Sequence, residues 1–183
     1  MPRFRLSMLI RHLASIAALP FVVSVVVPVW VARRNNISLR LGTTGLQIVA
    51  QNAGVLVLAF GVFLFASSLR RFATEGEGTL APWDPPRQLV LRGPYRYVRN
   101  PMISGVLFIL FGEALLLLSR PHFMWGLIFL GMNILVIPLV EEPDLRRRFG
   151  DSYVDYCRHV PRLFPRLRPW EPEVVNAGLR PED

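Results

Sequence analysis

Nine residues, Gly93 to Pro101, gather arginine, tyrosine and proline into one basic segment that stands between long apolar stretches. Its guanidinium groups are suited to binding carboxylates or phosphates, because a guanidinium presents several N–H donors in a planar fork. All 21 basic residues of the 183-residue chain are arginines, so the whole basic signal is of this kind. An apolar run begins at Met102. We therefore expect the basic segment to be held at a membrane surface.

An acidic pair and a pair of tyrosines follow the last apolar run. Glu141 and Glu142 are suited to binding ammonium and hydroxyl groups, or to accepting a proton. Tyr153 and Tyr156 recur at a spacing that places them on one face of an amphipathic helix over 143–159. This face can either line a site or simply pack against the ends of the apolar helices.

Two further carboxylates stand apart from these groups. Glu113 lies inside an apolar run, where an ionisable side chain is either functional or paired with an arginine inside the bundle. Asp84 follows Trp83 in a proline-rich stretch that either folds over a site or is a plain linker. Both carboxylates are candidates for proton transfer.

Hydrophobic residues make up 52% of the chain, and the mean hydropathy is +0.37, which is typical of a membrane protein. Gly54 and Gly61 offer small surfaces for close helix contact. We predict an all-α fold in a single domain over 1–165, with an extended tail over 166–183. The expected elements are four transmembrane helices over about 13–31, 46–68, 102–118 and 123–140, a cytoplasmic loop over 70–101, and a cytoplasmic amphipathic helix over 143–159.

Arginines are unevenly distributed around these four spans. Seventeen lie on the side that carries both termini and the basic segment, and four lie on the other side. The positive-inside rule therefore predicts an inner-membrane protein with both termini in the cytoplasm. A nucleic-acid partner is disfavoured, because the arginines flank apolar runs instead of following a soluble face. The single cysteine, Cys157, excludes an internal disulfide and a multi-cysteine metal site.

Several motifs in succession resemble one superfamily of membrane enzymes. They are the basic segment Gly93-Pro-Tyr-Arg-Tyr-Val-Arg-Asn-Pro-Met102, the acidic pair, the pattern Leu145-x3-Phe149-Gly150-x2-Tyr153-x2-Tyr156-x3-Val160-Pro-Arg162, and the upstream stretch Gly76 to Pro86. Together they resemble the isoprenylcysteine carboxyl methyltransferase and phospholipid methyltransferase superfamily. The pattern Arg-His-Pro-x-Tyr of that superfamily is altered at two positions, with Asn100 in place of His and Ile103 in place of Tyr.

The resemblance implies that S-adenosylmethionine binds at the cytoplasmic face, where its methyl group is transferred to a lipophilic acceptor with S-adenosylhomocysteine as product. The acceptor is expected to be a lipid amine, which needs a base, or a prenyl-type carboxylate, which does not. No metal is required, since a sulfonium needs none for methyl transfer. The implied cofactor-binding residues are Tyr95, Val98, Arg99, Asn100, Pro101, Glu141, Glu142, Tyr153 and Tyr156, and the candidate catalytic residues are Glu142, Asp84 and Glu113.

Two other classes of function remain open from the sequence. A membrane reductase of the sterol type, which uses NADPH, has a related arrangement of spans and a cytoplasmic dinucleotide site. A non-enzymatic membrane scaffold that keeps the cofactor fold is the second alternative. The short cytoplasmic face and the order of the motifs favour methyl transfer, and the sequence sets no oligomeric state.

Overall fold

The computed structural model describes residues 17–75 and 89–171, and every regular element in these ranges is helical. The predicted all-α fold is confirmed for this part of the chain. The elements in chain order are the π-helix η1 (Ala17–Val26), α2 (Val27–Arg34), α3 (Gly45–Glu75), the 3-10 helix η2 (Gly93–Arg96), α4 (Pro101–Leu116), α5 (Arg120–Val136), the π-helix η3 (Ile137–Glu141) and α6 (Glu142–His159).

Helices occupy the described part of all four ranges predicted as spans. Two stretches, Gly45–Arg71 and Arg120–His159, are long and apolar enough to cross a membrane by length and composition. Pro101–Leu116 is a shorter apolar helix. The second long stretch is continuous, because α5 passes through η3 directly into α6.

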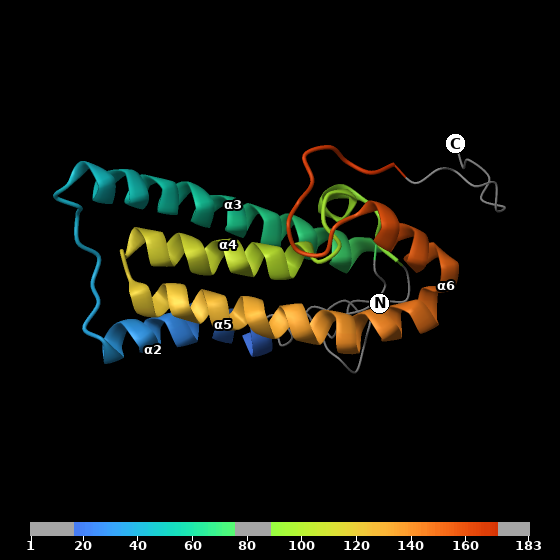
Figure 1. Cartoon of the computed structure of the whole chain (residues 1–183), viewed down its shortest axis with the longest axis horizontal. Helices are drawn as coiled ribbons and strands as arrows, with labels where there is room; N and C mark the ends of the chain where they lie inside the picture. The colour runs from blue at the N-terminus through green and yellow to red at the C-terminus, as the bar shows by residue number, and fades with distance from the viewer. Residues whose placement is uncertain (1–16, 76–88, 172–183) are drawn as a thin grey trace, which may run out of the picture.

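The long helices lie side by side in the order α3, α4, α5, α2, and chain neighbours run in opposite directions (Figure 1). At one end of this row, on the left in Figure 1, two connections over 35–44 and 117–119 join the helices. At the other end lie η2, α6 and the chain that follows α6. The basic segment and the acidic pair are thus brought to the same end of the molecule.

Four glycines allow α3 and α4 to pack in backbone contact. Gly54 and Gly61 lie on α3 and Gly105 and Gly112 on α4, and each pair is seven residues apart, which is two helical turns. A Cβ atom added at any of the four would come within 2.6–2.8 Å of a backbone nitrogen of the facing helix. The contact predicted for Gly54 and Gly61 is therefore confirmed, and α4 supplies the matching pair.

Two polar side chains of α5 hold it against the first helical stretch. His122 is buried, and its Nε2 lies 3.1 Å from the carbonyl oxygen of Pro28 while its Nδ1 lies 2.7 Å from the Ser119 hydroxyl. Since a carbonyl can only accept, Nε2 carries the proton and Ser119 donates to Nδ1. Trp125 Nε1 donates to the carbonyl of Val23 at 3.0 Å. These bonds satisfy polar groups that lipid would leave unpaired.

The chain after α6 forms a strap, residues 160–171, that lies across η2 and the start of α4. The backbone N–H of Arg166 donates to the carbonyl of Tyr97 at 3.0 Å, and that of Trp170 donates to the carbonyl of Arg96 at 2.9 Å. The strap is irregular with several bends, and its hydrogen bonds continue beyond residue 165. It therefore fixes the basic segment from outside the bundle.

α6 bends sharply at Gly150, where φ is +55° and ψ is −136°. A Cβ added there would meet nothing within 4 Å, so the glycine serves the backbone conformation and not a close neighbour. The bend lets the second half of α6 carry Tyr153 and Tyr156 into the core, where each is 2% exposed.

Candidate functional site

The segment that carries Arg99 is pinned at both of its ends. Gly93 begins η2 with a positive φ of 58°, which favours glycine, and Pro101 begins α4 at a position where its missing N–H is no loss. Between them, Val98 is completely buried. The backbone N–H of Arg99 donates to the carbonyl of Pro161 in the strap at 2.8 Å. The position of Arg99 is thus set by helix starts on both sides and by the strap.

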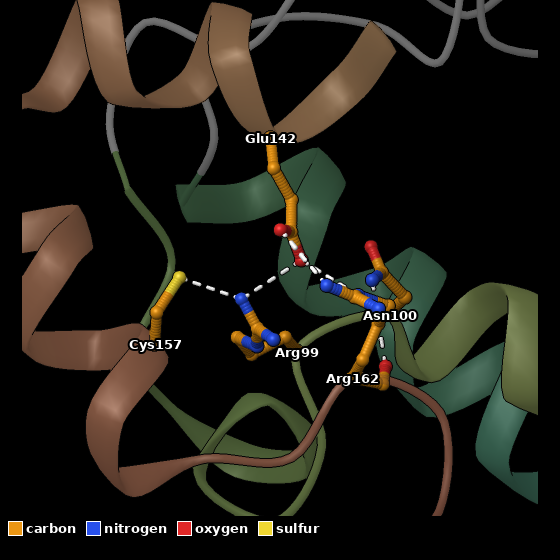
Figure 2. Close-up of polar contacts among 5 residues, drawn as sticks. All are labelled: Arg99, Asn100, Glu142, Cys157 and Arg162. Atoms are coloured by element: carbon orange, nitrogen blue, oxygen red, sulfur yellow. Dashed lines mark hydrogen bonds and ion pairs between the residues drawn. The ribbon is translucent and has the colours of Figure 1, made fainter. Parts of the chain in front are cut away.

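Glu142 is the centre of a charged cluster that joins the basic segment, α6 and the strap (Figure 2). Its Oε1 lies 3.0 Å from Nη1 of Arg99. Arg162 binds both carboxylate oxygens, with Nε 2.7 Å from Oε1 and Nη2 3.0 Å from Oε2. Nη1 of Arg99 also lies 2.6 Å from the sulfur of Cys157. Three elements far apart in the chain meet at this one carboxylate.

The cluster is largely withdrawn from solvent, since the side chains of Arg99 and Glu142 are 9% and 7% exposed. Burial alone would raise the pKa of Glu142, but the hydrogen bond from Arg162 and the charges of Arg99, Arg162 and Arg146 outweigh it and lower the pKa below its usual range. Glu142 is therefore ionised at neutral pH. Arg162, which is 34% exposed, closes the outer side of the cluster.

One N–H donor of the Arg99 guanidinium has no acceptor among the described residues. Its Nε is buried and has no hydrogen-bond partner among the described residues. A buried donor without an acceptor costs roughly 1–3 kcal/mol, so such atoms are rare and need an explanation. The remaining donor is suited to a carboxylate or phosphate oxygen that is supplied by a ligand.

The two tyrosines of α6 form a packed wall beside this cluster. The hydroxyl of Tyr156 donates to the carbonyl of Tyr95 at 2.6 Å, which ties α6 to η2. Tyr153, Tyr156 and Val160 form a buried apolar cluster, against which Trp170 of the strap packs. Burial raises the pKa of Tyr156 above its ordinary value, so this hydroxyl stays protonated.

Three other predicted site residues lie next to Arg99 in the chain or directly before α6. The backbone N–H of Asn100 donates to the carbonyl of Arg162 at 3.2 Å, and Pro101 is fully buried at the start of α4. Glu141 precedes α6, and burial together with the charge of Glu142 raises its pKa. These residues are brought together at one end of the bundle.

One of the predicted catalytic carboxylates, Glu113, is not part of this group. Glu113 lies twelve residues along α4 from Pro101, which is about 18 Å of helix, and it is therefore far from Arg99. Its Oε2 is buried without a hydrogen-bond partner among the described residues. Asp84 and the proline-rich stretch over 79–86 lie outside the described residues.

Two residues of the cluster were not singled out by the sequence. Arg162 appears there only as part of a motif, and Cys157 only as a lone thiol, yet both contact the charged pair. The position of Arg162 directly after Val160-Pro161 was the available signal, because a proline there ends α6 and turns the chain back.

Comparison with known proteins identifies the family. The pattern of the phospholipid methyltransferase family matches residues 41–152, which is more than half of the chain. The chain belongs to this family. Arg99 and Glu142 lie inside the matched range, whereas Cys157 and Arg162 lie beyond it. This is the superfamily that the sequence motifs resemble.

A curated relative is similar to one part of this methyltransferase. It is Methanethiol S-methyltransferase 2 of Bradyrhizobium diazoefficiens, which is 40% identical over 73 residues. The aligned part makes up 40% of this chain and 27% of the relative. Methyltransferases of this family use S-adenosylmethionine as methyl donor.

Proposed function

We propose that this methyltransferase transfers the methyl group of S-adenosylmethionine to a lipophilic acceptor at the cytoplasmic face of the membrane. The observation that carries the proposal is the buried, unpartnered Nε of Arg99 in a cluster of charges inside the family-matched range. A methionine carboxylate is a ligand of the right charge for that donor.

The charged cluster fits the donor molecule in a further respect. Glu142 and the Cys157 sulfur both hold Nη1 of Arg99, so the guanidinium is fixed before any ligand arrives. Fixing a side chain in advance reduces the entropy that binding must overcome. We assign the carboxylate of Glu141 to the ammonium or ribose hydroxyls of the donor, and the apolar tyrosine wall to its adenine.

The sulfonium of the donor supplies an electrophilic methyl group. Bond formation by the acceptor and departure of the thioether occur in line, and the protein accelerates such a step by alignment and exclusion of water. The packed tyrosine wall and the strap exclude water in this way, because Tyr153 and Tyr156 are each only 2% exposed. Arg99 and Glu142 have the positioning role.

A base is needed only for an acceptor that is protonated, such as a lipid amine. Glu142 is a poor base, because two guanidinium groups hold its pKa below the usual range. Glu141 is the better proton acceptor, because burial and its acidic neighbour raise its pKa. A prenyl-type carboxylate would need no base. A small thiol is a second candidate acceptor, favoured by the methanethiol named in the relative.

The proposed membrane arrangement has four spans with both termini in the cytoplasm. The charge distribution supports it, since Arg70, Arg96, Arg99 and Arg162 belong to the end that holds η2 and α6. Arg120 belongs to the opposite end. This polarity follows the positive-inside rule.

Calorimetry with the purified protein tests the donor site. Arg99→Ala and Glu142→Ala should each weaken binding of S-adenosylmethionine or S-adenosylhomocysteine by about 1.5–3 kcal/mol, the usual cost of losing a hydrogen bond to a charged group. Arg120→Ala, at the other end of the bundle, is the matched control and should bind as the wild type does. Unchanged affinity in both site variants would reject the proposed roles.

Turnover with labelled donor tests the acceptor. Incubation with a membrane-lipid extract should label a lipid product, and incubation with methanethiol would label a volatile thioether if the small thiol is the acceptor. Glu141→Gln distinguishes acceptors that must lose a proton from those that need not, because it should slow methylation of an amine or a thiol and leave methylation of a carboxylate unchanged.

A further inference from the structure

A groove of about 1130 Å³ is lined by residues of α3, the basic segment and the strap, and none of the tyrosine-wall residues lines it. Its floor is the second half of α3, and its sides are η2 and residues 165–167 of the strap. The volume is at the upper end of the range of about 300–1,000 Å³ that is usual for small-ligand sites. Neither Arg99 nor Glu142 lines it.

The residues that line the groove change from apolar to basic along α3. Phe60, Phe63 and Phe108 form an apolar part, and the basic part, two to three helical turns further along α3, contains Arg70 together with Arg166 of the strap. Among the described residues, none that lines the groove is acidic. A ligand that fits must therefore be apolar at one end and anionic at the other.

The apolar part is left uncovered by the protein. Phe63 is 67% exposed, and Leu167, on the strap beside Arg166, is 99% exposed. Arg70 is exposed and makes no side-chain hydrogen bond or ion pair within the described residues. Arg166 is half-buried, and its Nη1 donates to the carbonyl of His159, the last residue of α6, at 2.7 Å. Both arginines thus retain donors for an anion.

We propose that this groove binds an anionic membrane phospholipid, with the phosphate between Arg70 and Arg166 and an acyl chain along Phe63 and Phe60. A phosphodiester accepts paired hydrogen bonds from guanidinium groups, and the phenylalanine side chains cover the start of the hydrocarbon. The bound lipid is a structural ligand, separate from the methyl acceptor.

The lipid would brace the strap against α3. Arg166 lies four residues beyond Arg162, which closes the charged cluster on Glu142, and both belong to the strap. A lipid that bridges Arg70 and Arg166 links the strap to the bundle on the side away from α6. Binding of the lipid therefore stabilises the folded protein, as any ligand specific for the native state does.

Delipidated protein in neutral detergent provides the test, with phosphatidylglycerol titrated into mixed micelles while thermal unfolding is followed. The lipid should raise the unfolding temperature of the wild type. Arg70→Gln and Arg166→Gln should each weaken the apparent affinity about fivefold, which corresponds to about 1 kcal/mol for each basic residue at an anionic lipid surface. Arg158→Gln, which removes an exposed arginine of α6 outside the groove, should behave as the wild type does.

Two outcomes would overturn the proposal. One is an affinity for phosphatidylglycerol in Arg70→Gln that equals that of the wild type. This variant is sufficient by itself if Arg166→Gln does not fold after losing its contact with the His159 carbonyl. The other is equal stabilisation by soluble glycerol phosphate, because a site for free phosphate does not need the phenylalanine side chains. Phosphatidylcholine at the same concentration should stabilise less than phosphatidylglycerol, because its headgroup carries no net charge.

Discussion

Glu142 accepts hydrogen bonds or ion pairs from two guanidinium groups at 2.7–3.0 Å, so its charge balances both of them. Removing that charge leaves Arg99 buried without a counter-ion, which is expensive. We expect Glu142→Gln to lower the free energy of unfolding by about 3 kcal/mol, the lower end of the range for breaking a buried pair, because Arg162 stays partly exposed. Denaturant unfolding in detergent measures this.

Asp144→Asn is the control for that measurement. Asp144 pairs with Arg148 one turn along α6 at 3.6 Å, and its side chain is 53% exposed. Exposed pairs of this kind contribute about 0.5 kcal/mol or less. A Glu142→Gln effect as small as that of Asp144→Asn would contradict the balance of charges described above.

The lowered pKa of Glu142 also gives the protein a dependence on pH. Because the folded-state pKa lies below the unfolded value, the unfolded chain binds protons more readily. The stabilisation is complete above the ordinary pKa of 4.5 and is lost as pH falls through the folded value. Unfolding temperatures measured at decreasing pH should fall in this window for the wild type. They should fall less for Glu142→Gln, and an identical slope in both proteins would exclude Glu142 as the group responsible.

The sequence indicated Arg99 and Glu142 because their types stand out against apolar surroundings. It did not indicate that Arg162 and Cys157 complete the cluster, because this depends on the path of the strap after α6. Arginines are frequent in that part of the chain, so residue type alone could not select one. The backbone bonds from Arg99 to the Pro161 carbonyl and from Asn100 to the Arg162 carbonyl fix which arginine reaches Glu142.

At the scale of elements, the contact of α3 with α4 depends on the absence of side chains at four glycines. Gly61→Ala would place a Cβ 2.7 Å from the backbone nitrogen of Ile109, so the helices must separate. We expect a loss of about 1–3 kcal/mol, as for other overpacked interiors. Gly131→Ala on α5 is the control, because its Cβ meets nothing within 4 Å, and it should be neutral or stabilising by about 0.5–1 kcal/mol. Thermal unfolding of both variants measures the difference, and equal effects would contradict the close packing.

Gly150 tests the bend in α6 in a different way. Alanine there has room, so its effect reports the strain of a positive φ alone, about 1–2 kcal/mol. Gly45→Ala, which also has room and begins a helix, is the matched control. The bend holds Tyr156 against η2, so Gly150→Ala should also weaken donor binding. A variant as stable and as tightly binding as Gly45→Ala would show that the bend is not required.

Helical periodicity and apolar runs were enough to predict the positions of all the long helices, because each is set by local composition. The starts of α4 at Pro101 and of α6 at Glu142 lie within one residue of the expected starts at 102 and 143, since a proline marks both. The π-helices η1 and η3 were not predicted. Each contains a proline, Pro20 or Pro138, which lacks the N–H of a regular helix hydrogen bond.

For the molecule as a whole, the charged cluster, the strap and the groove all lie at the end that holds η2 and α6, and few arginines lie at the other end. This uneven distribution of arginines decides the orientation in which a helical bundle is inserted into the membrane, because arginines near the ends of spans are retained in the cytoplasm. The proposed donor site requires this orientation, since S-adenosylmethionine is charged and does not cross hydrocarbon. Orientation is therefore the most direct test of the proposed arrangement.

Single cysteines in a Cys157→Ser background can report the orientation in intact cells. Leu41 lies in the connection between α2 and α3 and is 88% exposed, whereas Leu167 lies on the strap and is 99% exposed. A membrane-impermeant maleimide should label Leu41→Cys from outside the cell and should label Leu167→Cys only after the membrane is opened. Because both positions are well exposed, a difference in labelling reports the side of the membrane and not burial. The reverse pattern would exclude a cytoplasmic donor site, and labelling of both from outside would exclude the odd number of spans that the proposed arrangement places between them.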